Sequence, residues 1–323
     1  ICAGTQGKGV SCLDLRAPRR GWQPAGLDGV NVTGLWIDPE RPDLMFAGTD
    51  GAFDVILMFR TRDGGGTWEP IGANVPFPQS GVRLMSLVQG VPGSSTVFAA
   101  GGSVWRSDDL GETWREVLTQ AYQAALEVAP TDPETVWAGG DLAFTFAPAS
   151  YTAVTRDGGA GWRVVWETGP STYAPSLDAA AHPAIDGLAL LGYGGYVLRT
   201  EDHGGTIAPV LQSPVGFRLD WGPGPGLAYA AGSPLTNATG GAEAYLSRDG
   251  GASWASIAGK TLVPRRIFDL TADLRWAGVA FATLEPPDPP SGEALFLLAR
   301  EEGGDYGRSS DGRPRAVTFG DCL

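Results

Sequence analysis

A phrase of eight residues recurs five times along the chain and constrains its fold more than any other feature. The copies begin at Thr61, Ser107, Thr155, Thr200 and Ser247, and they vary around the skeleton Ser/Thr-x-Asp-x-Gly-x-Thr-Trp. The Asp residues stand at positions 63, 109, 157, 202 and 249, so the phrase repeats every 45 to 48 residues. A period of this size indicates one supersecondary unit, copied many times, that buries its apolar face only against its neighbours.

The residue types of this phrase, which we call a box, predict a braced hairpin turn. Glycines after the Asp permit positive φ, and the Asp carboxylate can accept hydrogen bonds from backbone N–H groups of its own turn. The terminal Trp buries a large ring where the next strand begins. We therefore expect a structural role for Asp63, Trp68, Asp109, Trp114, Asp157, Trp162, Asp202, Asp249 and Trp254.

The box resembles the Asp-box, or BNR, repeat, and the resemblance covers nearly the whole chain. Proteins with this repeat include sialidases and other glycoside hydrolases, xyloglucan-cleaving enzymes, sortilin-type receptors, and proteins resembling the photosystem II stability and assembly factor. The resemblance implies a β-propeller whose boxes lie on one face of the disk, with function on the opposite face. It implies an architecture more than an activity, because one propeller fold serves many purposes.

The composition agrees with an all-β protein. The chain has 323 residues with 48 Gly and 25 Pro, and its short aromatic and β-branched segments are separated by turn residues. A net charge of −13 would repel phosphate backbones, which excludes nucleic acid as an expected partner. No run of 18 apolar residues predicts a membrane span, and we expect a monomer. The chain begins inside a predicted strand, which a removed signal peptide would explain, so we expect a secreted or periplasmic protein of bacterial type.

Each period predicts four strands, which the first full copy places near residues 32–38, 44–49, 55–62 and 67–71. Later copies occupy about 82–118, 123–167, 175–211 and 215–258, and a degenerate copy follows Arg266. At the ends of the chain, Ile1 to Thr5 matches the second strand of a copy, and Arg315 to Phe319 has the alternation of a first strand. We therefore predict a seven-bladed β-propeller forming a single domain over residues 1–323. Its first blade is shared by residues 1–26 and 313–323, which closes the ring and removes an exposed edge.

The three cysteines are too few for a disulfide scaffold and badly spaced for zinc, so no cofactor or metal is predicted. Pairing of the chain ends would bring Cys322 close to Cys2, and a disulfide between them would clasp the closure. Cys322 could instead pair with Cys12. Cys2 and Cys12 could also pair across strands, or all three could remain thiols.

Charged residues alternate with apolar ones on the predicted first strands of the blades. Such side chains are costly to bury unless they are paired or hydrated, so we expect them to face a wet central channel. This candidate binding site consists of Arg83, Glu127, Asp178, Arg218, Asp220 and Asp269. The group could bind a polar ligand, hold a cation, or pair internally. Four aromatic residues expected on the same face could stack on sugar or peptide groups: Tyr122, Tyr173, Tyr193 and Tyr196.

Two classes of function follow from the resemblance. A sialidase would require clustered arginines, a Tyr nucleophile paired with Glu, and a Phe/Tyr-Arg-Ile-Pro segment, which the sequence lacks. A general glycosidase needs two nearby carboxylates, which Asp178, Asp220 and Asp269 could supply. The chain is most similar to the single-propeller assembly-factor-like group. We therefore expect a non-enzymatic binding or scaffolding propeller that recognises a protein or carbohydrate partner on the channel face, with a glycoside hydrolase as the alternative.

Overall fold

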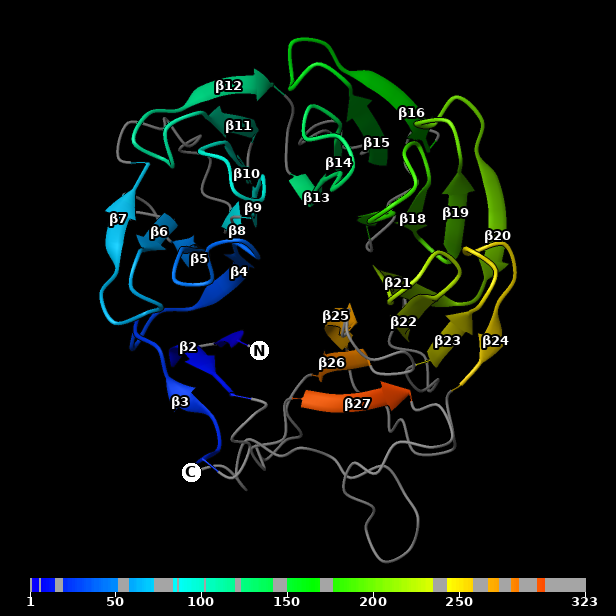
Figure 1. Ribbon diagram of the computed structural model, residues 1–323. Coiled ribbons are helices and arrows are strands. Elements are labelled where there is room, and N and C mark those ends of the chain that lie inside the picture. Colours follow the sequence, from blue (N-terminus) through cyan, green and yellow to red (C-terminus); the bar gives the residue numbers. More distant parts are fainter. Residues whose placement is uncertain are drawn as a thin grey trace, which may run out of the picture. The chain divides into compact units, whose positions relative to one another are not determined.

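The repeats of the sequence fold into successive antiparallel sheets (Figure 1). The structure, a computed structural model, describes residues 2–5, 7–14, 20–51, 58–72, 84–85, 87–101, 103–119, 123–141, 150–168, 177–234, 243–257, 267–272, 280–284 and 295–299. Every regular element in these ranges is a β-strand, so they hold no helix that could cross a membrane. The chain divides into two compact units, Ile1–Tyr173 and Ala174–Leu323, which are described separately.

Among its described residues, the first unit contains four sheets whose main strands follow chain order. The first sheet has three strands, β1 (Cys2–Thr5), β2 (Gly9–Cys12) and β3 (Gln23–Pro24). The second comprises β4 (Val32–Ile37), β5 (Met45–Gly51), β6 (Met58–Thr61) and β7 (Glu69–Ile71), with β8 (Leu84–Met85) pairing with β5. The third comprises β9 (Leu87–Gly90), β10 (Val97–Ala100), β11 (Val104–Ser107) and β12 (Arg115–Leu118). The fourth comprises β13 (Gln123–Val128), β14 (Val136–Asp141), β15 (Ser150–Thr155) and β16 (Arg163–Glu167).

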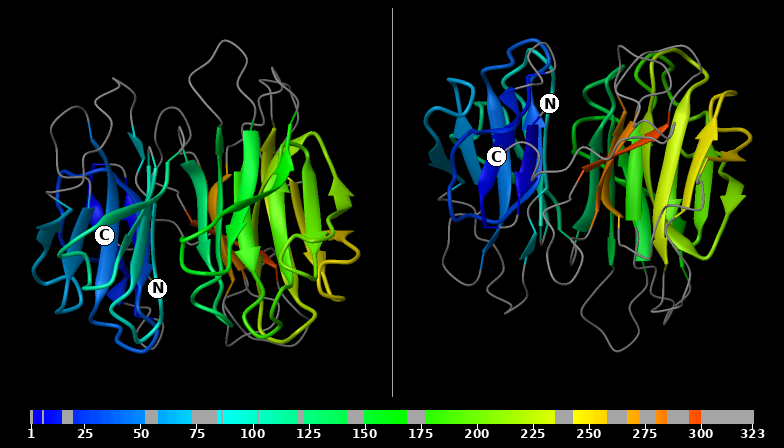
Figure 2. Two further views of the ribbon diagram at one scale, coloured as in Figure 1. Left: turned by 90° about the horizontal axis from the view of Figure 1, so that it is seen from above. Right: turned by 90° about the horizontal axis from the view of Figure 1, so that it is seen from below.

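The second unit contains three sheets among the described residues. The first comprises β17 (Leu177–Ala181), β18 (Ala189–Tyr193), β19 (Tyr196–Thr200) and β20 (Ala208–Gln212). The second comprises β21 (Val215–Trp221), β22 (Ala228–Pro234), β23 (Glu243–Ser247) and β24 (Ala255–Ser256). The third comprises β25 (Ile267–Ala272), β26 (Ala280–Leu284) and β27 (Leu295–Ala299). The further views in Figure 2 show the β17–β20 and β21–β24 sheets side by side.

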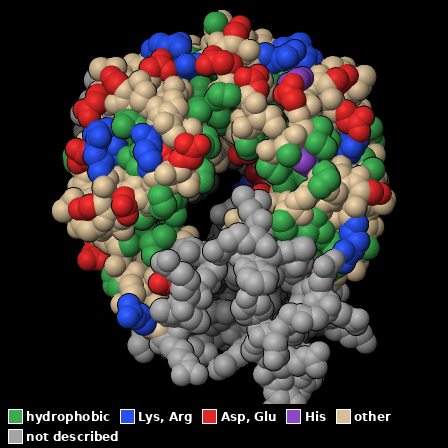
Figure 3. All heavy atoms as spheres, viewed as in Figure 1, with side chains coloured by type: hydrophobic (Ala, Val, Ile, Leu, Met, Phe, Trp, Pro, Cys, Tyr) green, Lys and Arg blue, Asp and Glu red, His purple; other side chains and the backbone are tan. Residues whose placement is uncertain are grey.

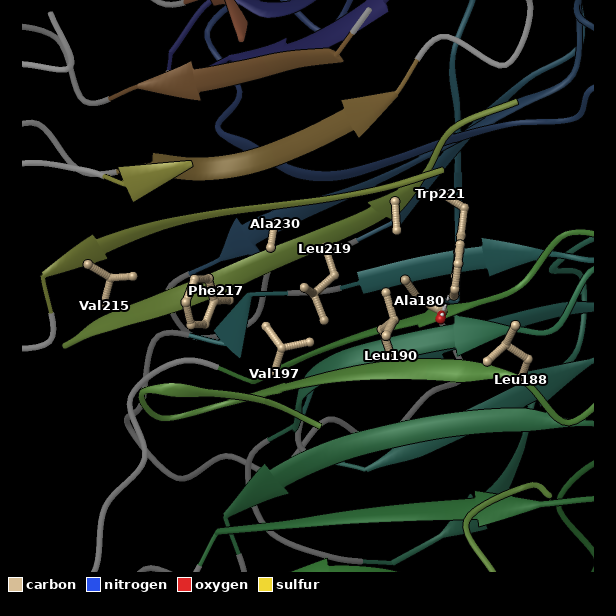
Figure 4. Close-up of a cluster of buried hydrophobic side chains, with 10 residues drawn as sticks. Ala180, Leu188, Leu190, Val197, Val215, Phe217, Leu219, Trp221 and Ala230 are labelled. Carbon is tan, nitrogen blue, oxygen red and sulfur yellow. Dashed lines mark hydrogen bonds between the residues drawn. The ribbon is translucent and has the colours of Figure 1, made fainter. Parts of the chain in front are cut away.

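Within each unit the sheets pack face to face through apolar side chains. The cluster between the β17–β20 and β21–β24 sheets includes Leu190, Phe217 and Trp221, and the Trp221 indole N–H donates to Ala180 O at 2.9 Å (Figure 4). Along β21 buried and half-buried residues alternate strictly, as expected for a strand of period two whose one side faces the β17–β20 sheet. Four similar clusters join the other consecutive sheets inside the two units. Burial between sheets is therefore the main source of stability.

The predicted Cys2–Cys322 disulfide is wrong, because Cys2 is bonded to Cys12. The two cysteines face each other as Cα partners in the β1–β2 hairpin, with their Cα atoms 4.0 Å apart. Local strand pairing therefore brings this pair together without any contact between the chain ends. Cys322 lies outside the described residues.

The all-β architecture is confirmed, whereas the number of blades stays a prediction. The described sheets begin with three strands at residues 2–24, as the sequence predicted for the first blade. The closing segment, residues 313–323, lies outside the described residues, so the ring closure and the single domain also stay predictions. The expected wet channel depends on how the two units are placed and is likewise a prediction.

Candidate functional site

The five boxes fold into the same hydrogen-bonded turn. In the first copy, the Thr61 hydroxyl donates to Asp63 Oδ1 at 2.7 Å and accepts the Gly65 N–H at 3.0 Å. The backbone N–H and the hydroxyl of Thr67 donate to Asp63 Oδ1 and Oδ2 at 2.8 and 2.7 Å. The same hydroxyl and the same backbone N–H bind the carboxylates of Asp109, Asp157, Asp202 and Asp249. Each of these carboxylates therefore stabilises its own turn.

These hydrogen bonds lower the pKa of the box carboxylates. The pKa falls to about 2 in three of them, Asp63, Asp109 and Asp249. The largest cause at Asp63 is the backbone N–H of Thr67, and at Asp109 it is the hydroxyl of Thr113. Donors aimed at a carboxylate favour its charged form. At neutral pH these groups are ionised acceptors, which suits a brace and does not suit a general acid.

The backbone of each box explains its glycines. The two residues after the Asp have positive φ in every copy, for example 70° and 97° at Gly64 and Gly65. Leu110 and His203 occupy the first of these positions in two copies, with φ of 59° and 56°. His203 has a compensating contact, because its Nε2 lies 2.9 Å from Asp186 Oδ1. The left-handed region is costly for residues other than Gly, so both positions carry local strain.

In three of the five copies, an arginine three residues before the box Asp connects that copy to the following one. Arg106 Nη1 donates to Gly158 O at 3.1 Å, and Arg199 Nε donates to Gly250 O at 2.7 Å. Arg60 Nη1 donates in the same way to Leu110 O. In each case the carbonyl belongs to the residue after the Asp of the following box. The guanidinium groups thus bind one turn to the next, and in Arg60 the side chain is buried.

The box tryptophans join sheets in two copies. Trp68 Nε1 donates to Ala25 O at 2.7 Å, and Trp162 Nε1 donates to Val117 O at 2.8 Å, each acceptor lying one sheet earlier. In Trp114 and Trp254 the indole N–H bonds to a glycine of its own box, and the remaining copy ends in Ile207 in place of Trp. The described boxes therefore use their polar groups on one another and on neighbouring sheets.

Two of the predicted site carboxylates bind the backbone of the next sheet. Asp178, on β17, accepts the Leu219 N–H of β21 at 2.7 Å. Asp220, on β21, accepts the Ala272 N–H of β25 at 2.7 Å and the N–H of Trp221 at 2.8 Å. The same contact therefore recurs at two successive sheet boundaries of the second unit. Both carboxylates are half-buried acceptors.

For the other predicted site residues, the structure gives the position in a strand and the burial. Glu127 and Arg218 are half-buried on β13 and β21. Tyr193 is buried at the end of β18, whereas Tyr196 begins β19 with 39% of its surface exposed. The backbone of Asp269 lies on β25. Three predicted residues lie outside the described ranges: Arg83, Tyr122 and Tyr173.

The turn between β17 and β18 is held by a buried histidine that the sequence did not single out as structural. His182 Nδ1 accepts the N–H groups of Ala184 and Ile185 at 3.0 and 2.9 Å, and Nε2 lies 3.3 Å from Pro225 O. Because Nδ1 accepts, the ring proton is on Nε2, which donates to the carbonyl. Burial lowers the pKa of this imidazole. Asp38 stabilises the β4–β5 turn in a similar way. Its carboxylate accepts two N–H groups of that turn and the N–H of Gly93 in the next sheet.

Two separate groups of polar contacts near the β18–β19 hairpin were not predicted from the sequence. Gln212 Nε2 donates to Tyr196 Oη at 3.0 Å, and the adjacent Ser213 hydroxyl donates to Glu243 Oε2. Tyr245 Oη donates to the same Glu243 oxygen at 2.6 Å. The spacing of Glu243 and Tyr245 on one side of a strand could have indicated their pairing. Nothing in the sequence indicates that Ser213 reaches them from the preceding sheet.

No protein-family model matches the chain, and no curated protein matches it in sequence. The chain is similar in structure to the GH74 xyloglucanase from Xanthomonas campestris, with 17% identity, a TM-score of 0.62, and coverage of 92% of this chain and 55% of that one. It thus spans about half the length of that enzyme.

Two further solved structures match over nearly their full length. A putative 6-phosphogluconolactonase from Bacteroides fragilis has 10% identity and a TM-score of 0.59, with coverage of 98% of this chain and 92% of that one. YCF48 bound to D1 peptide has 15% identity and a TM-score of 0.55, with coverage of 88% and 93%. At such identities the likeness concerns the fold alone. These neighbours are β-propeller proteins, and the all-β sheets of this chain are those of a β-propeller.

Proposed function

We propose that this chain is a non-catalytic binding propeller that recognises a protein or glycan partner on the face carrying the β18–β19 hairpin. The observation that supports it is the use of Asp178 and Asp220 as acceptors for the backbone of the next sheet. A glycosidase needs one carboxylic acid that donates a proton and one carboxylate that attacks or activates water. Two carboxylates whose oxygens hold neighbouring strands are placed for structure and not for either role.

The comparisons add support of a weaker kind. YCF48 is similar to this chain over 88% of it and 93% of that chain, and its structure contains a bound peptide. A propeller of this size can therefore serve as a binding protein without a second domain. The xyloglucanase, in contrast, is about twice as long as the matched region. Fold likeness alone does not decide function, so a direct assay is required.

We place this protein outside the cytosol, in a secreted or periplasmic location. The Cys2–Cys12 disulfide supports this, because such bonds persist in oxidising compartments and are rare in the cytosol.

The test is a search for turnover by the purified chain. Aryl glycosides and plant polysaccharides should release no product above background, because Asp178 and Asp220 hold the backbone of the next sheet. Asp178→Asn and Asp220→Asn should each lower the midpoint of thermal unfolding, because an amide is a weaker acceptor for the N–H of the next sheet. Asp28→Asn is the matched control, since Asp28 is exposed and should tolerate the change. Product release that either variant abolishes without lowering thermal stability would establish the hydrolase instead.

A further inference from the structure

The repeat changes its residues where the first compact unit ends and the second begins. The boundary, between Tyr173 and Ala174, lies between the third and the fourth box. In the second and fourth copies, the arginine three residues before the box Asp, Arg106 or Arg199, donates to a carbonyl of the following box. The third copy has Val154 at this position, and a valine side chain has no hydrogen-bond donor.

The fourth box lacks the second kind of linking group. It ends in Ile207, where the other four boxes end in Trp. In the first and third boxes this tryptophan, Trp68 or Trp162, donates its indole N–H to the preceding sheet. An isoleucine cannot make that bond. The position that would link the third copy forward and the position that would link the fourth copy backward are therefore both aliphatic.

Inside each unit, by contrast, every pair of consecutive sheets shares at least one hydrogen bond from a side chain. These bonds are made by Trp68, Arg60 and Arg106 in the first unit and by Arg199 and Asp220 in the second. The apolar clusters described above also join two sheets of the same unit in each case. The stability of a repeat array is the sum of its repeats and of the interfaces between neighbours. An interface that loses its linking groups couples its two sides less strongly.

We propose that the chain consists of two cooperative units that open and unfold separately, with their boundary between the third and the fourth box. Each unit keeps its internal hydrogen bonds and apolar clusters while the other opens, because Val154 and Ile207 replace the linking groups at the boundary. A partner that binds one unit then stabilises that unit alone. The inference does not depend on the proposed binding function, and a closed ring of repeats can contain such units.

The experiment measures native-state hydrogen exchange of the full chain by mass spectrometry, with peptides that report on each unit. Arg106→Lys weakens a link inside the first unit, so the slowest amides of that unit should exchange about fivefold faster or more. Those of the second unit should change by less than about twofold. Arg199→Lys should give the reverse pattern. Arg115→Lys is the control, because Arg115 is exposed and its change should leave both units unaltered.

A second variant tests the cause of the separation. Val154→Arg combined with Ile207→Trp supplies the groups that other copies carry, so exchange should slow in both units, since opening either one now breaks the added links. Val154→Met combined with Ile207→Leu adds no donor and should not slow exchange. Thermal unfolding shows whether each pair folds, and the arginine variants decide alone if the first pair does not.

Two results would overturn the proposal. If Arg106→Lys and Arg199→Lys each speed exchange equally in both units, the chain unfolds as one cooperative molecule. If neither variant speeds exchange in its own unit, the links do not hold the units together.

Discussion

The polar groups of each box bind one another, so the loss of one side chain should remove several hydrogen bonds from the same turn. The Asp109 carboxylate binds the Ser107 hydroxyl and both the N–H and the hydroxyl of Thr113. An Asn side chain can accept through only one of its two terminal atoms. The turn would then keep its backbone conformation with fewer hydrogen bonds to hold it.

Asp109→Asn should therefore lower the free energy of unfolding at pH 7 by about 1 kcal/mol, the usual size of a lost capping interaction near the surface. The pKa of Asp109 is about 2 in the folded protein, against an ordinary value of 3.8 for an aspartate. Its contribution is thus complete above pH 3.8 and is lost as the pH falls from there toward 2. Urea unfolding at several pH values should show the gap between variant and unaltered protein narrowing in that window. A gap that stays constant with pH would contradict the assignment.

His182 predicts a second pH dependence with a different window. Burial lowers its pKa from the ordinary histidine value of 6.5, and its neutral ring accepts two N–H groups on Nδ1. The unfolded chain therefore takes up a proton at higher pH than the folded protein, and stability falls as the pH drops below 6.5. His182→Asn should remove that part of the loss in urea unfolding between pH 7.5 and 5. His203→Asn, which changes the other histidine, should leave it in place.

At the scale of elements, the arginine links between boxes decide how firmly consecutive sheets are joined. Arg106 binds Gly158 O, Asp108 and Glu134, and only 12% of its side chain is exposed. A lysine has a single ammonium group and cannot serve all three acceptors from one position. The link therefore depends on the guanidinium geometry as well as on its charge.

Arg106→Lys should lower the free energy of unfolding by about 1 to 2 kcal/mol, because the carbonyl of buried Gly158 and two carboxylates lose donors. Arg115→Lys is the matched control. Arg115 is 56% exposed and lies 4.0 Å from Asp108, so its change should cost less than about 0.5 kcal/mol. Chemical denaturation of both variants measures the difference. Equal effects would mean that the contact with the following box contributes nothing.

The sequence predicted strands well where periodicity and turn residues coincide. The copy expected at residues 32–38, 44–49, 55–62 and 67–71 is found as Val32–Ile37, Met45–Gly51, Met58–Thr61 and Glu69–Ile71. The alternation of apolar and polar residues predicts which side of a sheet a side chain occupies. It does not predict the hydrogen-bond partner of that side chain. For that reason the roles of Asp178 and Asp220 could not be read from the pattern. The Cys2–Cys12 pair is the kind of contact that a sequence can predict, because hairpin pairing is local, whereas the expected ring closure favoured Cys322 as the partner of Cys2.

At the scale of the whole molecule, the net charge distinguishes a cationic protein partner from a neutral glycan, because only the first is attracted by it. The chain carries a net charge of −13, and on the face in Figure 3 basic side chains lie beside acidic ones. Acidic excess would attract a cationic partner at long range, and salt would screen that attraction. A neutral glycan is insensitive to this field. The partner class is therefore accessible to an experiment that needs no mutation.

The affinity for a neutral polysaccharide should change by less than about twofold when NaCl is raised from about 50 to 500 mM. Binding driven by a basic protein segment should weaken by about tenfold or more over the same range, because association depends on screened charges. Isothermal titration at both salt concentrations makes the comparison. Strong salt dependence of polysaccharide binding would contradict recognition by hydroxyl contacts and stacking.

The arginine of one box and the carbonyl that it binds in the following box recur at fixed offsets from the Asp. Duplication of a period that contains this arginine, such as the one with Arg106, would therefore bring its own donor for the copy after it and its own acceptor for the copy before it. An insertion or deletion of part of a period would separate donor from acceptor at the junctions on either side. Such periods can be gained or lost whole in evolution while the contacts between consecutive boxes are kept. Insertions or deletions of any other length would break these contacts.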